Sequence, residues 1–282
     1  MNTLHATESY LSLLLSLPNL DPYTVLSVFF LTLARLLPVL ALAPFLGSQN
    51  VPMTIRVMFG VALTAIFLPQ NLLTVHHSIP FGMGFVFLCI KELVFGAVLG
   101  FLSSVPFYIA QMSGSLIDFQ RGASSLQVTD PTTKSQTGSI GILYNLVLIA
   151  VFYSLGGPFF FFDGVATSYQ MIPVDSFTNP DFFHASNPFW KMTFQIAQTM
   201  FTLCVQLAAP SLIGILLMDM FLGIANRLAP QVQIVFLGIP LKSWVGLALL
   251  TAAWALIIQV MGKQTLDWFK SINKLIQTVK FI

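Results

Sequence analysis

Long apolar stretches alternate with short polar breaks along the chain. A membrane-spanning helix needs about 20 mostly apolar residues, and the apolar–polar alternation of half-buried strands is absent here. Six stretches fit the helical description, at residues 24–46, 57–68, 79–110, 140–155, 194–222 and 234–261. The third is too long for one straight crossing, and the fourth ends at Gly156-Gly157-Pro158, before a shorter apolar piece that starts at Phe159. The pattern predicts an all-α polytopic membrane protein of long, broken helices and helical hairpins.

Prolines interrupt several of these stretches. Pro69, followed by the polar pair Gln70-Asn71, is expected to end the second stretch, because proline offers no N–H to a helix. Four further prolines lie inside apolar stretches and free backbone carbonyls that need partners within protein: Pro38, Pro44, Pro210 and Pro240.

The carboxyl-terminal residues differ in kind from the rest. In KQTLDWFKSINKLIQTVKFI, one helix face carries Phe269, Ile272, Ile276 and Val279, and another carries Lys270 and Lys274. This spacing predicts an amphipathic basic helix at 263–282, suited to an anionic membrane surface or to a partner's groove, after a single membrane-embedded domain at 1–262. A frayed hydrophilic tail is the alternative.

The composition supports a membrane protein. Hydrophobic residues make up 56% of the chain and charged residues 8%, with a mean hydropathy of +0.84. Soluble domains carry roughly 25% charged residues, so this chain has too few charges to cover a water-facing surface. The net charge of +2 is too small to suggest nucleic-acid binding.

Charge placement does not settle the number of crossings. Four lysines after Met261 favour a cytoplasmic carboxyl terminus, and the first 34 residues, which contain no Lys or Arg, favour an outside amino terminus. Those ends demand an odd number of crossings, whereas hydropathy gives six segments. One segment must fail to cross, or the split fourth segment must count twice.

Four charged residues, Arg35, Lys91, Glu92 and Asp219, lie within apolar stretches. Each costs on the order of 2.5–3.5 kcal/mol in a membrane, so such groups face protein or water and pair with one another. Lys91 and Glu92 are neighbours in sequence and point to different helix faces, so we expect each to reach another helix or another subunit instead of its neighbour. Four such sites in a small chain favour an obligate assembly.

Two motifs bear on helix packing. Gly96 and Gly100 form a G-x-x-x-G pattern that indicates close helix–helix approach, with chance occurrence as the alternative. In LGIANRLAPQVQIVFLGIPLK, residues 222–242, a polar turn separates two apolar runs and predicts a helix–helix connection. Its candidate contact residues are Asn226, Arg227, Pro230 and Gln231.

Residues 118–138, DFQRGASSLQVTDPTTKSQTG, form a polar loop between two of the most apolar segments. The candidate functional residues in it are Asp118, Gln120, Arg121, Gly122, Asp130, Pro131 and Lys134. Small residues permit a mobile backbone, and Asp130-Pro131 sets a turn. The chain has no Walker-type lysine and no nucleophile–base–orienter arrangement. The sequence therefore predicts no catalytic, cofactor-binding or metal-binding residue and no enzyme activity.

Five motifs occur in a fixed order from Leu33 to Lys242: LARLLPVLALAPFLG, KELVFGAVLGF, the loop with Gln120, Gly122 and Asp130-Pro131, QLAAP, and LGIANRLAPQVQIVFLGIPLK. Together they resemble the FliR/SctT family, the export-apparatus component of flagellar and virulence type III secretion systems. The resemblance is closer to the virulence branch, and to chlamydial-type members in particular. One departure is the segment PFFFFDG after Gly156-Gly157, where the family often has a histidine and small polar residues.

The resemblance implies a single-copy subunit of the export gate in the bacterial inner membrane. Its partners would be several copies of two smaller membrane proteins in a helical hetero-oligomeric assembly, a switch protein at the entrance, secreted protein substrates and membrane lipid. No cofactor and no nucleic acid are implied. The family's loop corresponding to residues 119–138 projects into the channel and helps to plug it.

Three other interpretations stay open on sequence alone. Broken helices and charges at mid-membrane are typical of secondary transporters, in which Lys91, Glu92 and Asp219 would line a path for substrate or protons. A scaffold without a pore is another. The polar loop could also be a solvated cytoplasmic loop whose Arg121 and Lys134 anchor the topology.

Overall fold

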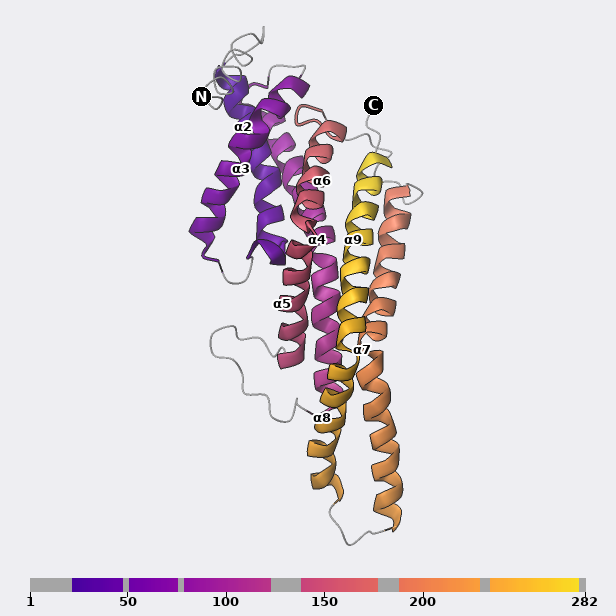
Figure 1. Cartoon of the computed structure of the whole chain (residues 1–282). Helices are drawn as coiled ribbons and strands as arrows, with labels where there is room; N and C mark the ends of the chain where they lie inside the picture. The colour runs from indigo at the N-terminus through magenta and orange to yellow at the C-terminus, as the bar shows by residue number, and fades with distance from the viewer. Residues whose placement is uncertain are drawn as a thin grey trace, which may run out of the picture. The chain divides into compact units, whose positions relative to one another are not determined.

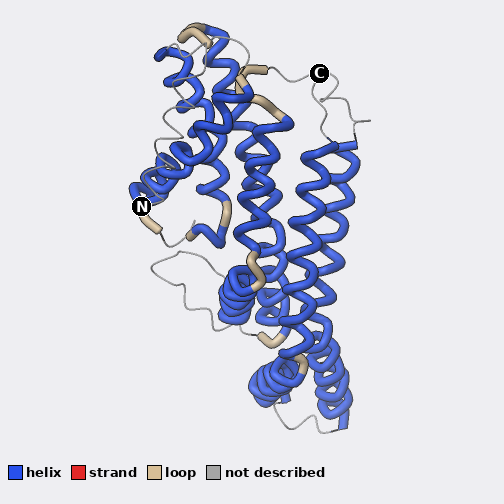
Figure 2. Tube along the Cα trace, turned by 45° about the horizontal axis from the view of Figure 1, so that its top comes forward, coloured by secondary structure: helices blue, strands red, loops and turns tan. Residues whose placement is uncertain are grey.

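The computed structural model describes residues 22–47, 51–75, 79–122, 138–176, 188–228 and 234–278. Within these ranges the chain is helical and contains no strand (Figure 2). The elements are α2 (Pro22–Leu42), the 3-10 helix η1 (Pro44–Leu46), α3 (Met53–Thr74), α4 (Met83–Gln120), α5 (Ser139–Ser154), α6 (Gly157–Met171), α7 (Pro188–Leu228), α8 (Ile234–Ala252) and α9 (Trp254–Thr278) (Figure 1). The all-α prediction is confirmed.

Apolar helices long enough to cross a membrane dominate these elements. Four single helices meet that description, in α2, α3, α4 and α7. The pairs α5–α6 and α8–α9 are each broken by a bend, and counting each pair as one span gives up to six. The chain is therefore a multi-pass membrane protein, and the break after α5 lies at the predicted Gly156.

Several predicted boundaries are wrong in the same direction, because helices run further than the polar residues suggest. Pro69 does not end α3, which continues to Thr74. The side chain of Asn71 is buried there, and its Nδ2 donates a hydrogen bond to Thr32 Oγ1 at 2.9 Å. This contact with α2 holds the last turn of α3 in place although the proline removes one helical hydrogen bond.

The helices around the two polar connections also extend beyond prediction. Phe119 and Gln120 belong to α4 and not to the loop, and Asn226 and Arg227 belong to α7 and not to the turn. Ile117 is fully buried in the last turns of α4. Tertiary packing of this kind overrides a local polar composition.

The described chain divides into two compact units. The described residues within Met1–Ser104, Phe159–Lys191 and Phe269–Ile282 form the first unit, and those within Val105–Pro158 and Met192–Trp268 form the second.

In the first unit, α2 packs against α3, α6 and the first half of α4. Val28, Leu31 and Val39 of α2 are buried. A Cβ atom added to Gly96 would collide with the backbone carbonyl of Arg35, and one added to Gly100 would lie 3.0 Å from Val39 Cα. The G-x-x-x-G pattern therefore marks a true close approach of α4 to α2, as the packing interpretation predicted.

In the second unit, α7 and α8 run side by side as a hairpin (Figure 1). Glycines permit the contact, since a Cβ atom on Gly246 would lie 3.0 Å from Ile215 Cδ1. The second half of α4 packs against α5, where the rings of Phe107 and Phe152 meet edge to face with centroids 5.4 Å apart. The α8–α9 pair bends by 63° at Ala253, so the predicted stretch 234–261 is not one straight helix.

Helix α9 contains most of the predicted amphipathic segment. Trp268, Ile272 and Leu275 are buried along it, whereas Lys270 and Lys274 are exposed. Residues 263–278 of the segment lie within α9. The helix passes residue 262 without a break, because α9 already begins at Trp254, and a domain boundary there stays a prediction.

Candidate functional site

A cluster of three charged side chains occupies the interior of the first unit. Arg35 from α2 and Glu92 from α4 are both fully buried. The guanidinium forms a two-pronged pair with the carboxylate, with Nε 2.5 Å from Oε2 and Nη2 2.8 Å from Oε1. Such a bidentate geometry is the strongest form of side-chain ion pair.

The remaining N–H groups of Arg35 reach the end of α6. Nη1 donates to the carbonyl of Ser168 at 2.9 Å and to its hydroxyl at 3.3 Å, and Nη2 donates to the carbonyl of Ile172 at 2.8 Å. All five donors of the guanidinium are therefore used. A cation at a helix carboxyl terminus is also favoured by the helix dipole.

Tyr169 completes the enclosure of Arg35. The guanidinium carbon lies 4.3 Å from the centroid of its ring, a cation–π arrangement. The tyrosine hydroxyl donates to the carbonyl of Thr32 at 3.0 Å. Arg35 thus joins α2, α4 and α6 through one side chain.

Lys91 corrects a prediction. Its Nζ lies 2.8 Å from Glu92 Oε1, so the two neighbours do pair, contrary to the expectation from helix geometry. The long, flexible lysine stem bends toward the segment that follows α6, where Nζ also donates to the carbonyls of Pro173 at 2.9 Å and Ser176 at 2.8 Å. Arg35, Lys91 and Glu92 therefore find their partners within this chain and need no other subunit.

The second cluster lies in the second unit, where the polar loop leaves α4. Asp118 keeps only 2% of its side chain exposed. Its Oδ1 accepts from Arg121 Nε at 2.9 Å and Nη2 at 2.5 Å, and its Oδ2 accepts from the backbone N–H groups of Ile140 at 2.8 Å and Gly141 at 3.4 Å. Arg121 Nη1 also donates to Ser243 Oγ in α8 at 3.3 Å.

The other candidate loop residues lie at the end of α4 or outside the described residues. Gln120 is the last residue of α4, and Gly122 follows with a φ of 85°, a left-handed conformation that favours glycine at a helix end. Asp130, Pro131 and Lys134 lie outside the described residues.

The third cluster is on the α7–α8 hairpin. Asp219 and Lys242 form an ion pair whose side chains remain 38% and 24% exposed, respectively. They border a groove of about 240 Å³ whose other lining residues are Leu222, Gly223, Asn226, Gly238 and Ile239. Arg227 is exposed in the last turn of α7. Pro230 and Gln231 lie outside the described residues.

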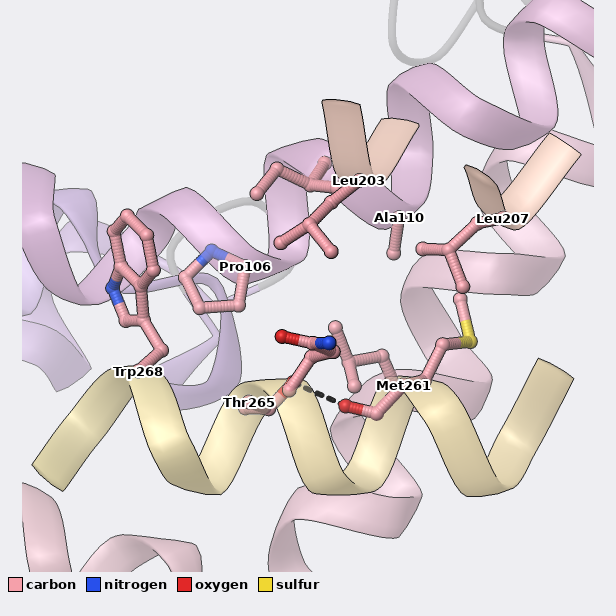
Figure 3. A pocket seen from close by; sticks show the side chains of 10 residues that line it. Pro106, Ala110, Leu203, Leu207, Met261, Thr265 and Trp268 are labelled. Atoms are coloured by element: carbon pink, nitrogen blue, oxygen red, sulfur yellow. Dashed lines mark hydrogen bonds between the residues drawn. The ribbon is translucent and has the colours of Figure 1, made fainter. Parts of the chain in front are cut away.

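An apolar pocket also lies in the second unit, beside Pro106 of α4 (Figure 3). Leu203, Leu207, Met261 and Trp268 contribute to its walls, and the hydroxyl of Thr265 is spent on the carbonyl of Met261 at 2.8 Å. Its volume of about 20 Å³ is close to that of one water-sized probe, so it is a packing defect and not a ligand site.

Sequence reasoning missed the acceptors and donors that surround the charges. Most of them are backbone groups, such as the carbonyls of Ile172 and Pro173, and a backbone carbonyl leaves no mark in the residue type. Ser243 is a side-chain partner, yet it follows Lys242 in an apolar run and carries no distinguishing signal.

Comparison with known proteins matches nearly the whole chain. The chain is 30% identical to the flagellar biosynthetic protein FliR of Aquifex aeolicus over 259 residues, which cover 90% of this chain and 96% of that relative. It is 31% identical to the surface presentation of antigens protein SpaR of Shigella sonnei over 220 residues, 77% of this chain and 79% of that relative. Because these two identities are nearly equal, the predicted preference for the virulence branch stays a prediction.

The family comparison covers all three clusters. The family model described as "Bacterial export proteins, family 1" matches residues 26–267. That range contains the Arg35 cluster, the Asp118 cluster and the Asp219–Lys242 pair. The chain therefore belongs to the FliR/SctT family of type III secretion export-apparatus proteins.

Proposed function

We propose that this chain is a single-copy subunit of a type III secretion export gate in the bacterial inner membrane. It forms part of the entrance to the channel for unfolded protein substrates, and the loop of residues 119–138 serves as the channel plug. Its partners are two smaller multi-copy membrane proteins and the switch protein of the same apparatus, as the family resemblance implies.

The observation that carries this proposal is the half-exposed ion pair on the α7–α8 hairpin. Asp219 and Lys242 sit among exposed apolar side chains, which include Phe221, Ile224 and Trp244. If this surface faced lipid, each charge would cost on the order of 2.5–3.5 kcal/mol. If it faced water, a large apolar surface would be exposed to solvent, which is unfavourable. A neighbouring protein helix satisfies both requirements.

The buried cluster argues against a transporter. In a transporter, charges at mid-membrane bind a substrate or relay protons and so keep an open coordination position. Here the donors of Arg35 and Lys91 are already taken by Glu92 and by backbone carbonyls. The cluster is built as an internal brace and not as a binding site.

The plug assignment is supported by how the loop is attached. Asp118 near the end of α4 accepts hydrogen bonds from Ile140 and Gly141 at the start of α5, so the loop leaves and returns at one point. A connector between two helices that already touch needs only 2–8 residues. The longer polar segment therefore has a use beyond connection.

The first experiment weighs the complex. A tagged copy of this chain, extracted from its own membrane in mild detergent, should appear by native mass spectrometry in a large particle with one copy of this chain and multiple copies of two smaller membrane proteins. A stable monomer or homodimer would contradict the proposal and favour the transporter.

A loop deletion tests the plug. Removing residues 124–131 leaves Asp118, Arg121 and the helix ends intact, so the particle should assemble at its normal yield while the membrane becomes leaky to ions. Ion leakage is measured by the collapse of the membrane potential in cells that make the complex. Loss of assembly without any leak would show that the loop is structural.

A further inference from the structure

The two ends of the polar loop are held by one buried carboxylate. Asp118 receives N–H groups from Arg121 on its own side of the loop and from Ile140 and Gly141 on the other side. Its side chain is 2% exposed, so these bonds form away from solvent. Hydrogen bonds to a charged group are stronger than neutral ones, and a carboxylate at a helix amino terminus is further favoured by the helix dipole.

The backbone segments around Asp118 are tightly packed. A Cβ atom on Gly114 would lie 2.6 Å from the backbone of Ile140 and Gly141, and one on Gly141 would lie 2.6 Å from Ser115 Oγ. A Cβ atom on Gly138 would overlap the Asp118 carboxylate itself. The end of α4 and the start of α5 are therefore in direct backbone contact, and Asp118 closes that contact.

Arg121 connects this joint to a third helix. While Nε and Nη2 hold Asp118, Nη1 donates to Ser243 Oγ of α8 at 3.3 Å. Ser243 follows Lys242, which pairs with Asp219 on the hairpin surface. The same arginine thus links the base of the loop to the hairpin that bears the half-exposed ion pair.

We infer that Asp118 and Arg121 are positioning residues that set the base of the loop and couple it to α8. Asp118 keeps the two ends together, and Arg121 fixes the orientation of that base relative to α8. The distance part of this inference stands on the described contacts alone, whereas its consequence for ion leakage rests on the proposed plug function.

The first test measures the base itself. In the assembled complex, with Cys89 and Cys204 replaced by serine, spin labels are placed at the exposed positions Phe119 and Ser139, and their separation is measured by pulsed electron resonance. The unaltered joint should give one narrow distance. Asp118→Ala should raise the population of longer distances about tenfold, the factor that corresponds to losing a hydrogen bond to a charged group.

Graded variants separate the two residues. Asp118→Asn keeps an acceptor for α5 but cannot receive the arginine fork, so its distance distribution should fall between those of the unaltered chain and Asp118→Ala. Gly138→Ala should widen the distribution while leaving both charges in place, because its methyl group displaces the carboxylate. Ser243→Ala should leave the Phe119–Ser139 distance narrow, since it removes only the link to α8.

The second test measures ion leakage with the same variants. Asp118→Ala and Gly138→Ala should leak, and Ser243→Ala should leak more weakly, with normal assembly of the particle in each case. Asp163→Asn is the matched control for charge and Gly84→Ala for the added methyl, because Asp163 is exposed and a Cβ atom on Gly84 meets nothing within 4 Å. Neither control should change the distance or the leak.

The outcomes separate this inference from the proposed function. Suppose that deleting residues 124–131 makes the membrane leak, whereas Asp118→Ala and Gly138→Ala keep a narrow distance and a sealed membrane. The role of Asp118 at the base of the loop is then wrong, and the plug function holds. If those variants widen the distance but neither they nor the deletion makes the membrane leak, Asp118 does hold the base of the loop and the plug function is wrong. If the deletion and Asp118→Ala both make the membrane leak while Ser243→Ala leaves it sealed, the coupling to α8 is wrong.

Discussion

The Arg35–Glu92 pair of the first unit and the Asp219–Lys242 pair of the second differ in how completely the chain encloses them. Arg35 and Glu92 have no exposed side-chain surface, and each nitrogen of the guanidinium has an acceptor. Asp219 and Lys242 keep 38% and 24% of their side chains exposed and border an open groove. The first pair belongs to the folding of this chain, whereas under the proposed function the second is available for association with another.

This difference shows which charged pairs in an apolar chain stabilise the fold. A buried pair fixes helices only if its hydrogen bonds are complete, because an incomplete pair costs more than it contributes. The Arg35 cluster meets that condition with α2, α4 and α6 and tolerates no further ligand. The hairpin pair contributes little to the fold by itself, since a partly exposed pair is worth roughly 0–1 kcal/mol.

Glu92→Gln should have the largest effect. The substitution removes the negative charge between Arg35 and Lys91 and leaves two cations in a buried setting. Breaking a buried pair in this way costs about 3–5 kcal/mol, a large part of the stability of a typical domain. We expect a much lower amount of the chain in the membrane and a lower Tm of the detergent-solubilised complex, followed by thermal scanning and blotting.

A second substitution distinguishes charge imbalance from lost shape. Arg35→Met combined with Glu92→Gln removes both members of the pair, so the double variant should be more stable than Glu92→Gln alone. Asp163→Asn, at an exposed position, serves as the matched control and should leave the Tm unchanged. If the double variant is the less stable one, Arg35 acts mainly through the α6 carbonyls and not through Glu92.

Gly96→Ala should have the next largest effect, and it tests the close packing of α4 against α2 next to the Arg35–Glu92 pair. The new methyl group would collide with the backbone carbonyl of Arg35, so α4 must move away from α2. Overpacking of this kind costs typically 1–3 kcal/mol. The expected result is a lower Tm of the complex.

The matched control is Gly84→Ala in the same helix. A Cβ atom there meets nothing within 4 Å, and alanine is the better helix former by roughly 0.5–1 kcal/mol. The Tm of this variant should therefore stay the same or rise slightly. Equal Tm values for the two alanine variants would mean that α2 and α4 are not in tight contact in the assembled protein.

The fold class could be predicted from sequence because apolar run length is a local property. The helix ends could not be predicted, because tertiary contacts extend the helices. Pro69 lies inside α3, and Gln120 is the last residue of α4. At Pro69 the deciding contact is Asn71 with Thr32, which lies 39 residues away in the chain. Local composition carries no information about such a partner.

The candidate site shows the same limit. The sequence identified Arg35, Lys91 and Glu92 as charges in need of partners, but not that they would satisfy one another. Arg35 and Glu92 lie 57 residues apart, and the Lys91–Glu92 contact depends on the carbonyls after α6 that draw the lysine toward them. Asp118 was singled out as a loop residue, whereas its partners in α5 become visible only in three dimensions.

Substitutions at the hairpin pair should have the smallest effect on the chain and a selective effect on association. Asp219→Asn should change the lifetime of the chain in the membrane little, because the pair is partly exposed and worth at most about 1 kcal/mol. The same variant should reduce the amount of smaller membrane proteins that copurify with the tagged chain. Exchanging the charges, with Asp219→Lys and Lys242→Asp together, decides why. If the pair serves only the hairpin, the exchange restores copurification, since an ion pair is present again. If a neighbouring helix contacts the two charges in their order, the exchange leaves copurification low, which is the result we expect from a groove that opens on both residues.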